Sequence, residues 1–294
     1  MKIFNLIGIT GLTIAMAACS GNNNNSDAYG NFETNDVLVS SEMQGKLVKF
    51  TAEEGETYTA GTQLGQIDTI QLDLKRAQLV AQRSLTNTKF QNITSQIQVQ
   101  EEQKQTLLTD KKRVQNLLKD NAAPQKQLDD IDGKISVIES QIASIKTQNS
   151  AVIDEINMID KQIAQINDQI RRCKIVNPIN GTVLEKYVEQ DEIVTPGKTL
   201  YKVADLTDMI LRVYVSGDQL SHIKLNQKVN VFIDKSKDET SELQGTITWV
   251  SPQAEFTPKI IQTKEERVNL VYAIKISVPN KGELKIGMPG EVKF

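Results

Sequence analysis

The chain has 294 residues, enough for about two ordinary domains. Its formal net charge of −3 argues against a nucleic-acid partner, which a strongly basic surface would attract. Aromatic residues make up only 5% of the sequence, which is sparse for two compact hydrophobic cores. We therefore expect part of the chain to be extended rather than globular.

The N-terminus predicts export. An apolar segment follows Lys2 and reaches Ala18, but glycine and threonine interrupt it, and it is too short for a transmembrane helix. It ends in MAAC, which resembles the lipobox of bacterial lipoproteins, with methionine in place of the usual leucine. The resemblance implies a signal peptide at residues 1–18 and a lipid anchor at Cys19; the alternative is a plain secretory signal with an incidental cysteine. The polar stretch that follows predicts a flexible tether at residues 19–33.

Two short stretches of the sequence, residues 44–68 and 180–205, resemble each other. In both of them two glycines stand 16 residues apart: Gly45 and Gly61 in the first, Gly181 and Gly197 in the second. Two or three short strands are marginal without a partner. We therefore expect the halves, residues 34–68 and 174–205, to combine into one small β-sandwich.

The insert between the halves, residues 69–173, predicts long helices. Its second part has apolar residues at strictly alternating steps of four and three, the heptad seam of a coiled coil, with Asn149 as the one polar member. The seam positions are Ile131, Ile135, Ile138, Ile142, Ile145, Asn149, Val152, Ile156, Ile159, Ile163, Ile166 and Ile170. The first part has a weaker seam, which Gln100, Lys104 and Lys111 interrupt. Its apolar and neutral positions are Leu72, Leu79, Thr86, Phe90, Ile93, Ile97, Leu107, Val114 and Leu118.

The sequence between the two seams predicts a turn. Pro124 cannot continue a helix but suits the first turn of a new one, and Asn121 suits a left-handed helix C-cap. We expect two antiparallel arms of about 48 residues, each about 70 Å long. A single continuous helix in an intermolecular coiled coil is the alternative, and Pro124 and the similar arm lengths argue against it. Because the arms of a hairpin begin and end side by side, the insert need not separate the halves of the sandwich.

The C-terminal part, residues 206–294, predicts a small β-barrel. Between its first two strands, residues 216–227 predict a short helix and a turn, where Asn226 tolerates a left-handed conformation. Several short strands joined by polar turns are typical of a barrel. The segments that alternate apolar and polar residues like half-buried strands are Met209–Val215, Lys228–Ile233, Gly245–Val250 and Leu270–Val278.

The split β-module, the long helical insert and the closing strands are together similar to periplasmic adaptors of the haemolysin-D type, the membrane fusion proteins of tripartite efflux and secretion systems. The resemblance covers about residues 34–294. It implies an α+β fold in which a split lipoyl-like β-sandwich is interrupted by a long antiparallel coiled-coil hairpin and followed by a small β-barrel. It also implies tight turns where glycine permits a positive φ, with Asp191 in the place of Gly55. The turn residues are Gly45, Gly55, Gly61, Gly181, Pro196 and Gly197.

The resemblance implies the partners as well. Ser251–Tyr272 looks like the corresponding segment of adaptors found with ATP-driven exporters. Leu284–Phe294 resembles the close of the barrel, and the given sequence ends there. Both favour an inner-membrane exporter of ABC type, joined to an outer-membrane channel. The family also implies a homo-oligomeric ring, of six copies, and an anchor in the inner membrane, although Ser20 would direct an enterobacterial lipoprotein to the outer membrane. The alternatives are an adaptor of a proton-driven, RND-type pump and a structural coiled-coil lipoprotein without a transport role.

The hairpin tip is the predicted docking site. In many adaptors the tip contacts the channel through an arginine, a leucine after three intervening residues and a serine after six more. Arg113 and Leu117 have this spacing, and Pro124 stands where the serine would be. The resemblance implies that these three residues, with Asn121 and Gln127, form the channel-docking tip. An exposed helix charge and an apolar residue at the edge of the seam would also explain the arginine and the leucine.

No pattern of residues predicts an enzyme. His222 is the only histidine, which excludes a histidine-based metal cluster and a Ser/His/Asp triad. The sequence has no P-loop, so the energy for transport must come from another subunit. Lipoyl and biotinyl domains carry a cofactor on a lysine at a hairpin tip, but no DKA or MKM motif is present, so we expect no cofactor. Cys173 is expected to be a structural thiol, because no histidine lies near it in the sequence.

Overall fold

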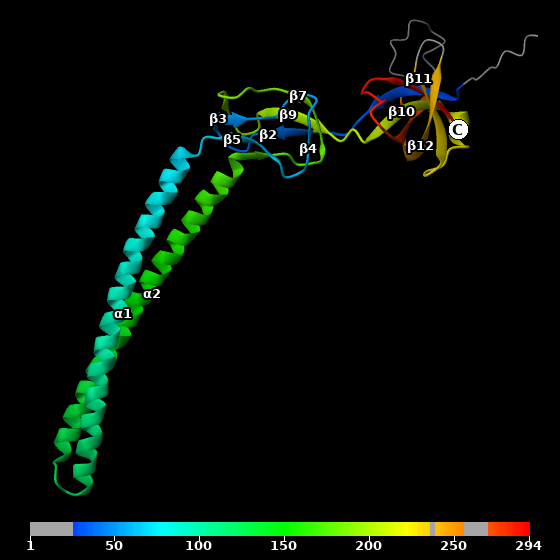
Figure 1. The fold of residues 1–294 in the computed structure, drawn as a ribbon. Helices are drawn as coiled ribbons and strands as arrows, with labels where there is room; N and C mark the ends of the chain where they lie inside the picture. The colour runs from blue at the N-terminus through cyan, green and yellow to red at the C-terminus, as the bar shows by residue number, and fades with distance from the viewer. Residues whose placement is uncertain (1–25, 236–238, 256–269) are drawn as a thin grey trace, which may run out of the picture. The chain divides into compact units, whose positions relative to one another are not determined.

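The computed structural model describes residues 26–235, 239–255 and 270–294. The predicted signal peptide, Cys19 and the first part of the tether lie outside these residues, as does most of Ser251–Tyr272. The chain forms two compact units: Val37–Val203 is one, and the segment up to Asp36 joins Ala204–Phe294 in the other. Figure 1 shows the first unit as a β-sandwich with a long helical hairpin and the second as a β-barrel, so the predicted α+β fold class is confirmed.

The β-sandwich consists of two four-stranded sheets with the orders β2-β9-β7-β4 and β6-β5-β3-β8. Four of these strands precede the helices and four follow them, and each sheet contains two strands from each half. The halves are therefore interleaved rather than stacked side by side. The strands are β2 (Asp36–Ser40), β3 (Gly45–Phe50), β4 (Thr57–Tyr58), β5 (Gln63–Ile67), β6 (Lys174–Val176), β7 (Gly181–Lys186), β8 (Ile193–Val194) and β9 (Thr199–Ala204).

Backbone hydrogen bonds between the halves follow the sequence repeat. The amide of Gly55 donates to the carbonyl of Val183 (2.9 Å), and its counterpart in the other half, Asp191, donates to Leu47 (2.8 Å). In the reverse sense, Leu47 donates to Glu192 (2.8 Å) and Val183 donates to Glu56 (3.0 Å). Each half thus supplies hydrogen-bond acceptors for backbone amides of the other. A short strand on its own would leave such backbone groups unpaired, so the two halves stabilise each other.

The core of the sandwich is drawn from both halves. Among its members, the phenol of Tyr201 is fully buried and donates to the side-chain oxygen of Asn177 (3.1 Å). The side-chain amide of Asn177, a residue that is also buried, donates to the backbone carbonyls of Ile179 (2.6 Å) and Tyr58 (3.3 Å). Burial raises the pKa of the Tyr201 phenol. The main apolar members of the core are Leu47, Phe50, Leu64, Ile67, Ile175, Val183, Val188, Val194, Leu200 and Val203.

The turns of the sandwich have the predicted backbone geometry at most of the predicted positions. Gly55 (φ 85°), Gly61 (φ 86°) and Gly197 (φ 85°) are left-handed, and so is Asp191 (φ 73°). Gly181 is not among the glycines with positive φ; it is buried inside β7, opposite Tyr58 of β4, so its conformation is that of a strand. The prediction of a positive φ is therefore wrong for Gly181, because this glycine lies in a strand and not in the turn before it.

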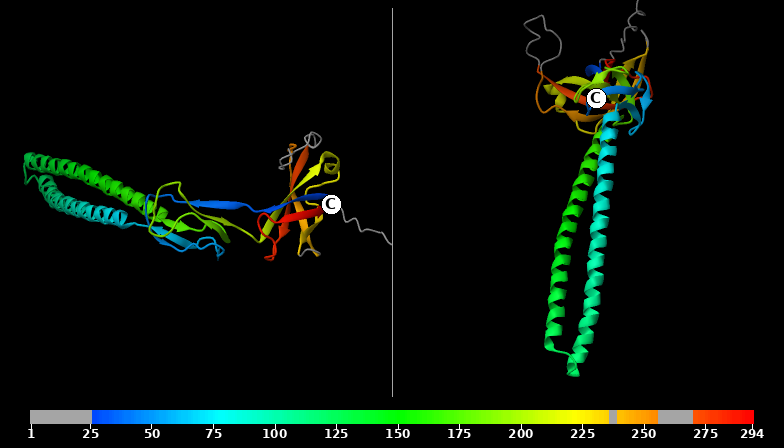
Figure 2. Two further views of the ribbon diagram at one scale, coloured as in Figure 1. Left: turned by 90° about the horizontal axis from the view of Figure 1, so that it is seen from above. Right: turned by 90° about the vertical axis from the view of Figure 1, so that its left-hand side faces the viewer.

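Two long helices, α1 (Ile70–Lys119) and α2 (Gln125–Arg172), form the predicted hairpin. At 1.5 Å per residue they are about 75 and 72 Å long. Figures 1 and 2 show them side by side along their lengths, which confirms the predicted hairpin and excludes the alternative of one continuous helix. Pro124 is the N-cap of α2 rather than a residue of its first turn.

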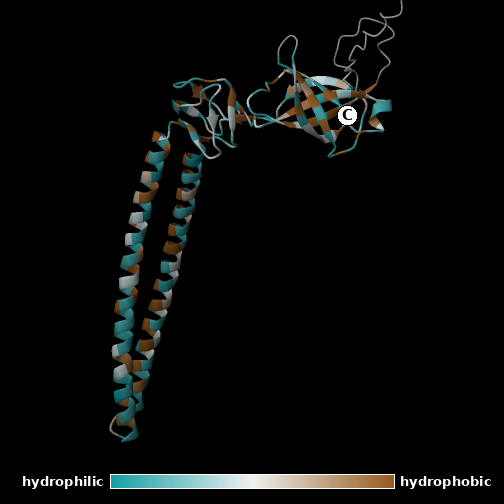
Figure 3. Ribbon diagram, turned by 45° about the vertical axis from the view of Figure 1, so that its right-hand side comes forward, coloured by the Kyte–Doolittle hydropathy of each residue, from teal (hydrophilic) through white to brown (hydrophobic). Residues whose placement is uncertain are grey.

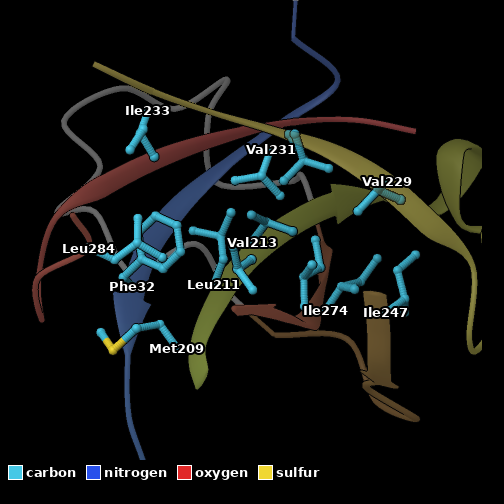
Figure 4. Close-up of a cluster of buried hydrophobic side chains, with 14 of the residues drawn as sticks. Phe32, Met209, Leu211, Val213, Val229, Val231, Ile233, Ile247, Ile274 and Leu284 are labelled. Carbon is cyan, nitrogen blue, oxygen red and sulfur yellow. The ribbon is translucent and has the colours of Figure 1, made fainter. Parts of the chain in front are cut away.

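The β-barrel is a closed sheet with the strand order β1-β10-β13-β12-β11-β14. Its interior is filled by alternate side chains of these strands, including Phe32, Leu211, Val231 and Ile274 (Figure 4). The predicted short helix is present as α3 (Gly217–Leu220), and Asn226 is left-handed (φ 65°). The strands are β1 (Ala28–Glu33), β10 (Asp208–Ser216), β11 (Lys228–Asp234), β12 (Thr240–Val250), β13 (Val271–Pro279) and β14 (Pro289–Lys293).

The strand β1 lies within the segment predicted as a flexible tether, so that prediction is wrong for Ala28–Glu33. The strand pairs with β10 and β14 and closes the barrel. Gly30 allows the close approach, because a Cβ atom there would lie 1.8 Å from the carbonyl oxygen of Arg212. The inward residues Ala28 and Phe32 carry the apolar alternation of a strand. The sequence did not reveal this pattern, because a polar stretch precedes the strand and several of its side chains are small.

Candidate functional site: the helical hairpin and its tip

A single seam joins the two helices. Every seam position predicted for α2, from Ile131 to Ile170, is buried or half-buried, and so is every position predicted for α1. Gln100, Lys104 and Lys111, which interrupt the seam of α1, are half-buried as well. The predicted coiled coil is therefore confirmed. Elsewhere the helices are largely hydrophilic, with scattered hydrophobic residues (Figure 3).

Three ion pairs between the helices follow one register. Lys111 contacts Asp132 and Lys104 contacts Glu139, both at 2.7 Å, so a step of seven residues on α1 matches a step of seven on α2. Arg83 and Asp160 (2.6 Å) continue the same register three heptads further along. The two lysines lie in the seam, but they pair with carboxylates that are 53% and 45% exposed. Lysine can reach such partners because its methylene stem can cover apolar surface while its ammonium group stays near water. The seam thus holds its register despite the cations.

The hairpin turns through a helix-terminating motif centred on Asn121. This residue is left-handed (φ 51°), and its amide donates to the carbonyl of Leu118 (3.1 Å). The next amide, of Ala122, donates to Leu117 (2.8 Å). Together these bonds form a Schellman motif, with asparagine in the place of the usual glycine. The tip is therefore an ordered turn with defined backbone geometry, and Asn121 takes the C-cap conformation predicted from the sequence.

The five predicted tip residues lie around this turn. Arg113 is 70% exposed in its side chain and pairs with Asp110 of the same helix (3.2 Å), and Leu117 is 41% exposed. Pro124 and Gln127 are exposed, and the amide of Gln127 donates to the carbonyl of Pro124 (3.0 Å). The tip therefore exposes one apolar side chain, that of Leu117, and one cation, that of Arg113, to solvent.

The other end of the hairpin is bonded to the sandwich. At the start of α1, Asp68 accepts from the amide of Ile70 (2.8 Å). At the end of α2, Arg172 pairs with Asp168 (2.7 Å) and with Glu42 of the loop before β3 (2.7 Å), and Arg171 also pairs with Asp168. The hydrogen bond from Arg172 is the main reason that the pKa of Asp168 is lowered. The pair between Arg172 and Glu42 is the ion pair among these that joins the hairpin to the sandwich.

Two features of the described residues bear on metal binding and on nucleophilic chemistry. Across residues 26–235, 239–255 and 270–294, no cluster of three or more His, Cys, Asp or Glu side chains could hold a metal ion. Cys173 is a free, buried thiol at the end of α2, and burial raises its pKa, which disfavours the nucleophilic thiolate. None of the helices in this part of the chain combines the length and apolarity needed to cross a membrane.

Comparisons with known proteins agree with this architecture. A curated membrane protein designated UPF0194 from Yersinia pseudotuberculosis is 27% identical over 296 residues, which cover 90% of this chain and 88% of the relative. The UPF0194 membrane protein YbhG of Salmonella arizonae is 24% identical, with 90% and 87% covered. Neither designation describes an activity.

Solved structures share the fold. MacA from Actinobacillus actinomycetemcomitans has a TM-score of 0.59 at 21% identity, covering 90% of this chain and 76% of that one. The membrane fusion protein Spr0693 from Streptococcus pneumoniae R6 has a TM-score of 0.52 at 15% identity, covering 90% and 97%. At these identities the likeness concerns the fold alone.

A family model is the more specific match. The model described as "RND MFP, barrel-sandwich hybrid domain", where MFP stands for membrane fusion protein, matches residues 35–206, which are more than half of the chain. These residues contain the whole sandwich and the hairpin within it. The chain therefore belongs to the membrane fusion proteins, the periplasmic adaptors of tripartite efflux systems.

Proposed function

We propose that this adaptor is lipid-anchored and joins an inner-membrane exporter of ABC type to an outer-membrane channel. The observation that carries the proposal is the hairpin, two helices of 50 and 48 residues that leave the sandwich and end in an ordered, exposed turn. A protein without a distant partner has no need of arms about 70 Å long. The hairpin acts as a spacer, and its tip is the contact with the channel.

The tip residues fit a docking role. Leu117 offers apolar surface next to the cation of Arg113, and Asn121 holds the chain in a fixed turn between them and α2. Exposed apolar side chains combined with arginine are typical of contact sites. Pro124 and Gln127 complete the surface at the start of α2. The contact would be made by exposed side chains that lie outside the seam between the two helices.

The energy for export comes from the partner, because the sequence has no P-loop. One feature supports an ABC-type exporter, the resemblance of Ser251–Tyr272 to adaptors of that class. The second candidate is an adaptor of a proton-driven pump, which the RND designation of the matching family model favours.

The remaining parts of the proposal concern assembly. Cys19 would carry the lipid and hold the protein at the inner membrane, with the barrel and the tether on the exporter's side. Several copies, six in the proposal, would form a ring in which the hairpins cross the periplasm together. A Cys19→Ala variant is expected to lose incorporation of labelled fatty acid and to leave the membrane fraction.

Site-directed crosslinking tests the tip. Leu117→Cys or Asn121→Cys is expected to crosslink to an outer-membrane channel in cells treated with a bifunctional thiol reagent. Leu85→Cys is the matched control, because this leucine is also exposed on α1 (70%) but lies near the root of the hairpin, the end that joins the sandwich. Crosslinks to the channel from Leu85→Cys, and none from the two tip variants, would overturn the assignment.

Purification in mild detergent tests the partners. An ABC transporter with ATPase activity is expected to copurify with the tagged adaptor, together with a channel. A copurifying proton-driven pump would favour the second candidate. Normal export in a deletion strain, with no copurifying membrane protein, would instead identify a structural coiled-coil lipoprotein.

A further inference from the structure

The connection between α3 and β11 ends in a tight turn that is held in one conformation. This turn consists of residues 224–228, and we call it the β11 turn. Asn226 is left-handed (φ 65°), and its amide donates to the carbonyl of Ile247 in β12 (2.9 Å). The amide of Ile247 donates in return to the carbonyl of Gln227 (3.0 Å). Two backbone hydrogen bonds thus fasten the turn to the barrel, so its backbone is fixed relative to the strands.

The β11 turn exposes an apolar side chain between two cations. Leu225 is 61% exposed, and Lys224 and Lys228 on either side of it are exposed as well. Neither lysine forms an ion pair within residues 26–235, 239–255 and 270–294. Residues 216–230 contain these two lysines and one carboxylate, that of Asp218, so the segment has an excess of positive charge. Such a surface suits the boundary of a lipid layer, where leucine reaches the acyl chains and lysine keeps its ammonium group among the headgroups.

This turn lies at the end of the barrel where the chain enters it. β1 begins beside the end of β14, and β11 begins beside the same end of β14. The side chain of Gln219 in α3 also donates to the backbone carbonyl of Asp27, directly before β1 (2.8 Å). Seven residue steps separate Ser26 from Cys19, and at about 3.5 Å per residue they span at most about 25 Å. With the lipid on Cys19, as in the proposed function, this end of the barrel stays within that distance of the membrane surface.

We infer that the β11 turn rests on the anionic surface of the membrane that holds the anchor, with Leu225 at the base of the headgroup layer and Lys224 and Lys228 beside lipid phosphates. The occupant is a lipid surface because the cations are uncompensated, an exposed leucine stands between them, and the chain to Cys19 is short. A lysine near an anionic membrane surface strengthens binding about fivefold. A lipid anchor alone leaves the barrel free to tilt, so a second contact fixes its orientation. This inference rests on the lipid anchor of the proposed function and adds a lipid contact made by the barrel itself.

A fluorescent label at the turn tests the contact. The full-length, lipidated Leu225→Cys variant is labelled with a thiol-reactive, environment-sensitive fluorophore and reconstituted in vesicles of phosphatidylethanolamine and phosphatidylglycerol. Cys173 is buried and Cys19 carries the lipid, so the label is confined to the turn. The label is expected to be quenched by lipids that carry a spin label just below the headgroup, and to emit at a shorter wavelength than a control label exposed to water.

Ile286→Cys provides this control. Ile286 is 49% exposed and precedes Gly287, whose amide donates to the carbonyl of Phe32 near the other end of β1 (2.8 Å). A label attached there belongs to the same barrel but faces away from the end where the chain enters. It is expected to emit as in water and to escape quenching by the spin-labelled lipids.

Charge variants test the role of the lysines. Replacing both Lys224 and Lys228 by glutamine in the labelled protein is expected to reduce the quenching, because the attraction to lipid phosphates is lost. Exchanging phosphatidylglycerol for phosphatidylcholine is expected to reduce the quenching of the protein with both lysines and to have little further effect on the double variant. Lys281→Gln is the control, at an exposed lysine between β13 and β14, and is expected to leave the quenching unchanged.

The outcomes separate the contact from its alternatives. Quenching at the turn that is no stronger than at the Ile286→Cys control, or that ignores both charge changes, would overturn the inference. Crosslinking of the Leu225→Cys variant to a copurified exporter, without quenching by lipid, would assign the turn to a protein contact instead. Circular dichroism checks the folding of each variant, and every substituted side chain is exposed.

The proposed function has separate readouts. Labelled fatty acid on Cys19 and a copurifying exporter would leave that proposal standing even where the quenching fails. Absence of labelled fatty acid from the unchanged protein would remove the anchor and overturn the inference with it.

Discussion

The sandwich and the hairpin belong to one compact unit but are stabilised differently. The sandwich joins residues far apart in the sequence, through interleaved strands and a core in which side chains such as Leu200 and Val203 are fully buried. The hairpin joins residues across one seam, where few side chains are fully buried and ion pairs of Lys104 and Lys111 span the helices. The comparison indicates that the sandwich folds as a single cooperative core, whereas the stability of the hairpin is distributed along its length.

The largest expected effect tests whether the two halves share one core. Leu64 and Leu200 are counterparts in the repeat, and both are buried to 1% exposure or less. Replacing either by alanine is expected to destabilise the protein by about 2–5 kcal/mol, since each change leaves a cavity in the same core. The measurement is denaturant-induced unfolding followed by the near-ultraviolet signal of the sandwich tyrosines.

A matched control is available on the hairpin. Leu85→Ala changes an exposed leucine of α1 and is expected to alter stability by no more than about 0.5 kcal/mol. If Leu64→Ala were as mild as this control while Leu200→Ala remained severe, the first half would contribute little to a shared core. The interleaved arrangement of the sandwich would then be of little consequence for stability.

The sequence predicts most where its signal is local or periodic. The heptad steps from Ile131 to Ile170 predict the seam, and Asn121 and Pro124 predict the turn. The repeat predicts a sandwich but not its interleaving, because pairing of β4 with β7 and of β3 with β8 joins residues distant in the chain. The strand β1 escaped prediction because Phe32 is its only large buried side chain.

The tip itself was predicted as a set of residues, and the structure gives their geometry. The spacing of Arg113 and Leu117 carries no information on exposure, which depends on where α2 packs. Likewise, the sequence could not show that Arg172 bonds to Glu42 across the root of the hairpin, because the two residues are far apart in the chain. Ion pairs at such distances are set by the fold and not by a motif.

A second prediction sharpens the description of the seam. Lys104 and Lys111 occupy seam positions, with side chains 32% and 31% exposed. Replacing both by leucine is expected to stabilise the hairpin by about 1 kcal/mol, because apolar groups of similar volume often match or exceed a partly buried ion pair. Thermal unfolding followed by far-ultraviolet circular dichroism measures the change. The variant should also respond less to added salt, which screens the native pairs.

Lys112→Leu is the control for this experiment, since this lysine is exposed and lies outside the seam. It is expected to leave the melting temperature and its salt dependence unchanged. A double variant that melts below the unchanged protein would show that the ion pairs stabilise the tip half of the hairpin more than apolar contacts could.

The smallest expected effect concerns the root of the hairpin and its response to acid. The pKa of Asp168 is lowered in the folded protein, first by its hydrogen bond with Arg172, while desolvation opposes the shift. A carboxyl group with a lowered folded-state pKa stabilises the fold above its unfolded pKa, which is about 3.9 for aspartate. This contribution is lost as the pH falls through the folded-state pKa.

Asp168→Asn removes the carboxylate and with it this pH dependence. The difference in melting temperature between the unchanged protein and the variant is therefore expected to be constant near neutral pH and to shrink below about pH 4. Asp154→Asn, at an exposed aspartate of α2 that forms no ion pair in the described part of the chain, should show no such trend. A difference that grows on acidification would mean that Arg172 does not favour the charged form of Asp168. The Asp168–Arg172 pair, which lies within α2, would then add nothing to the stability of the last turn of that helix.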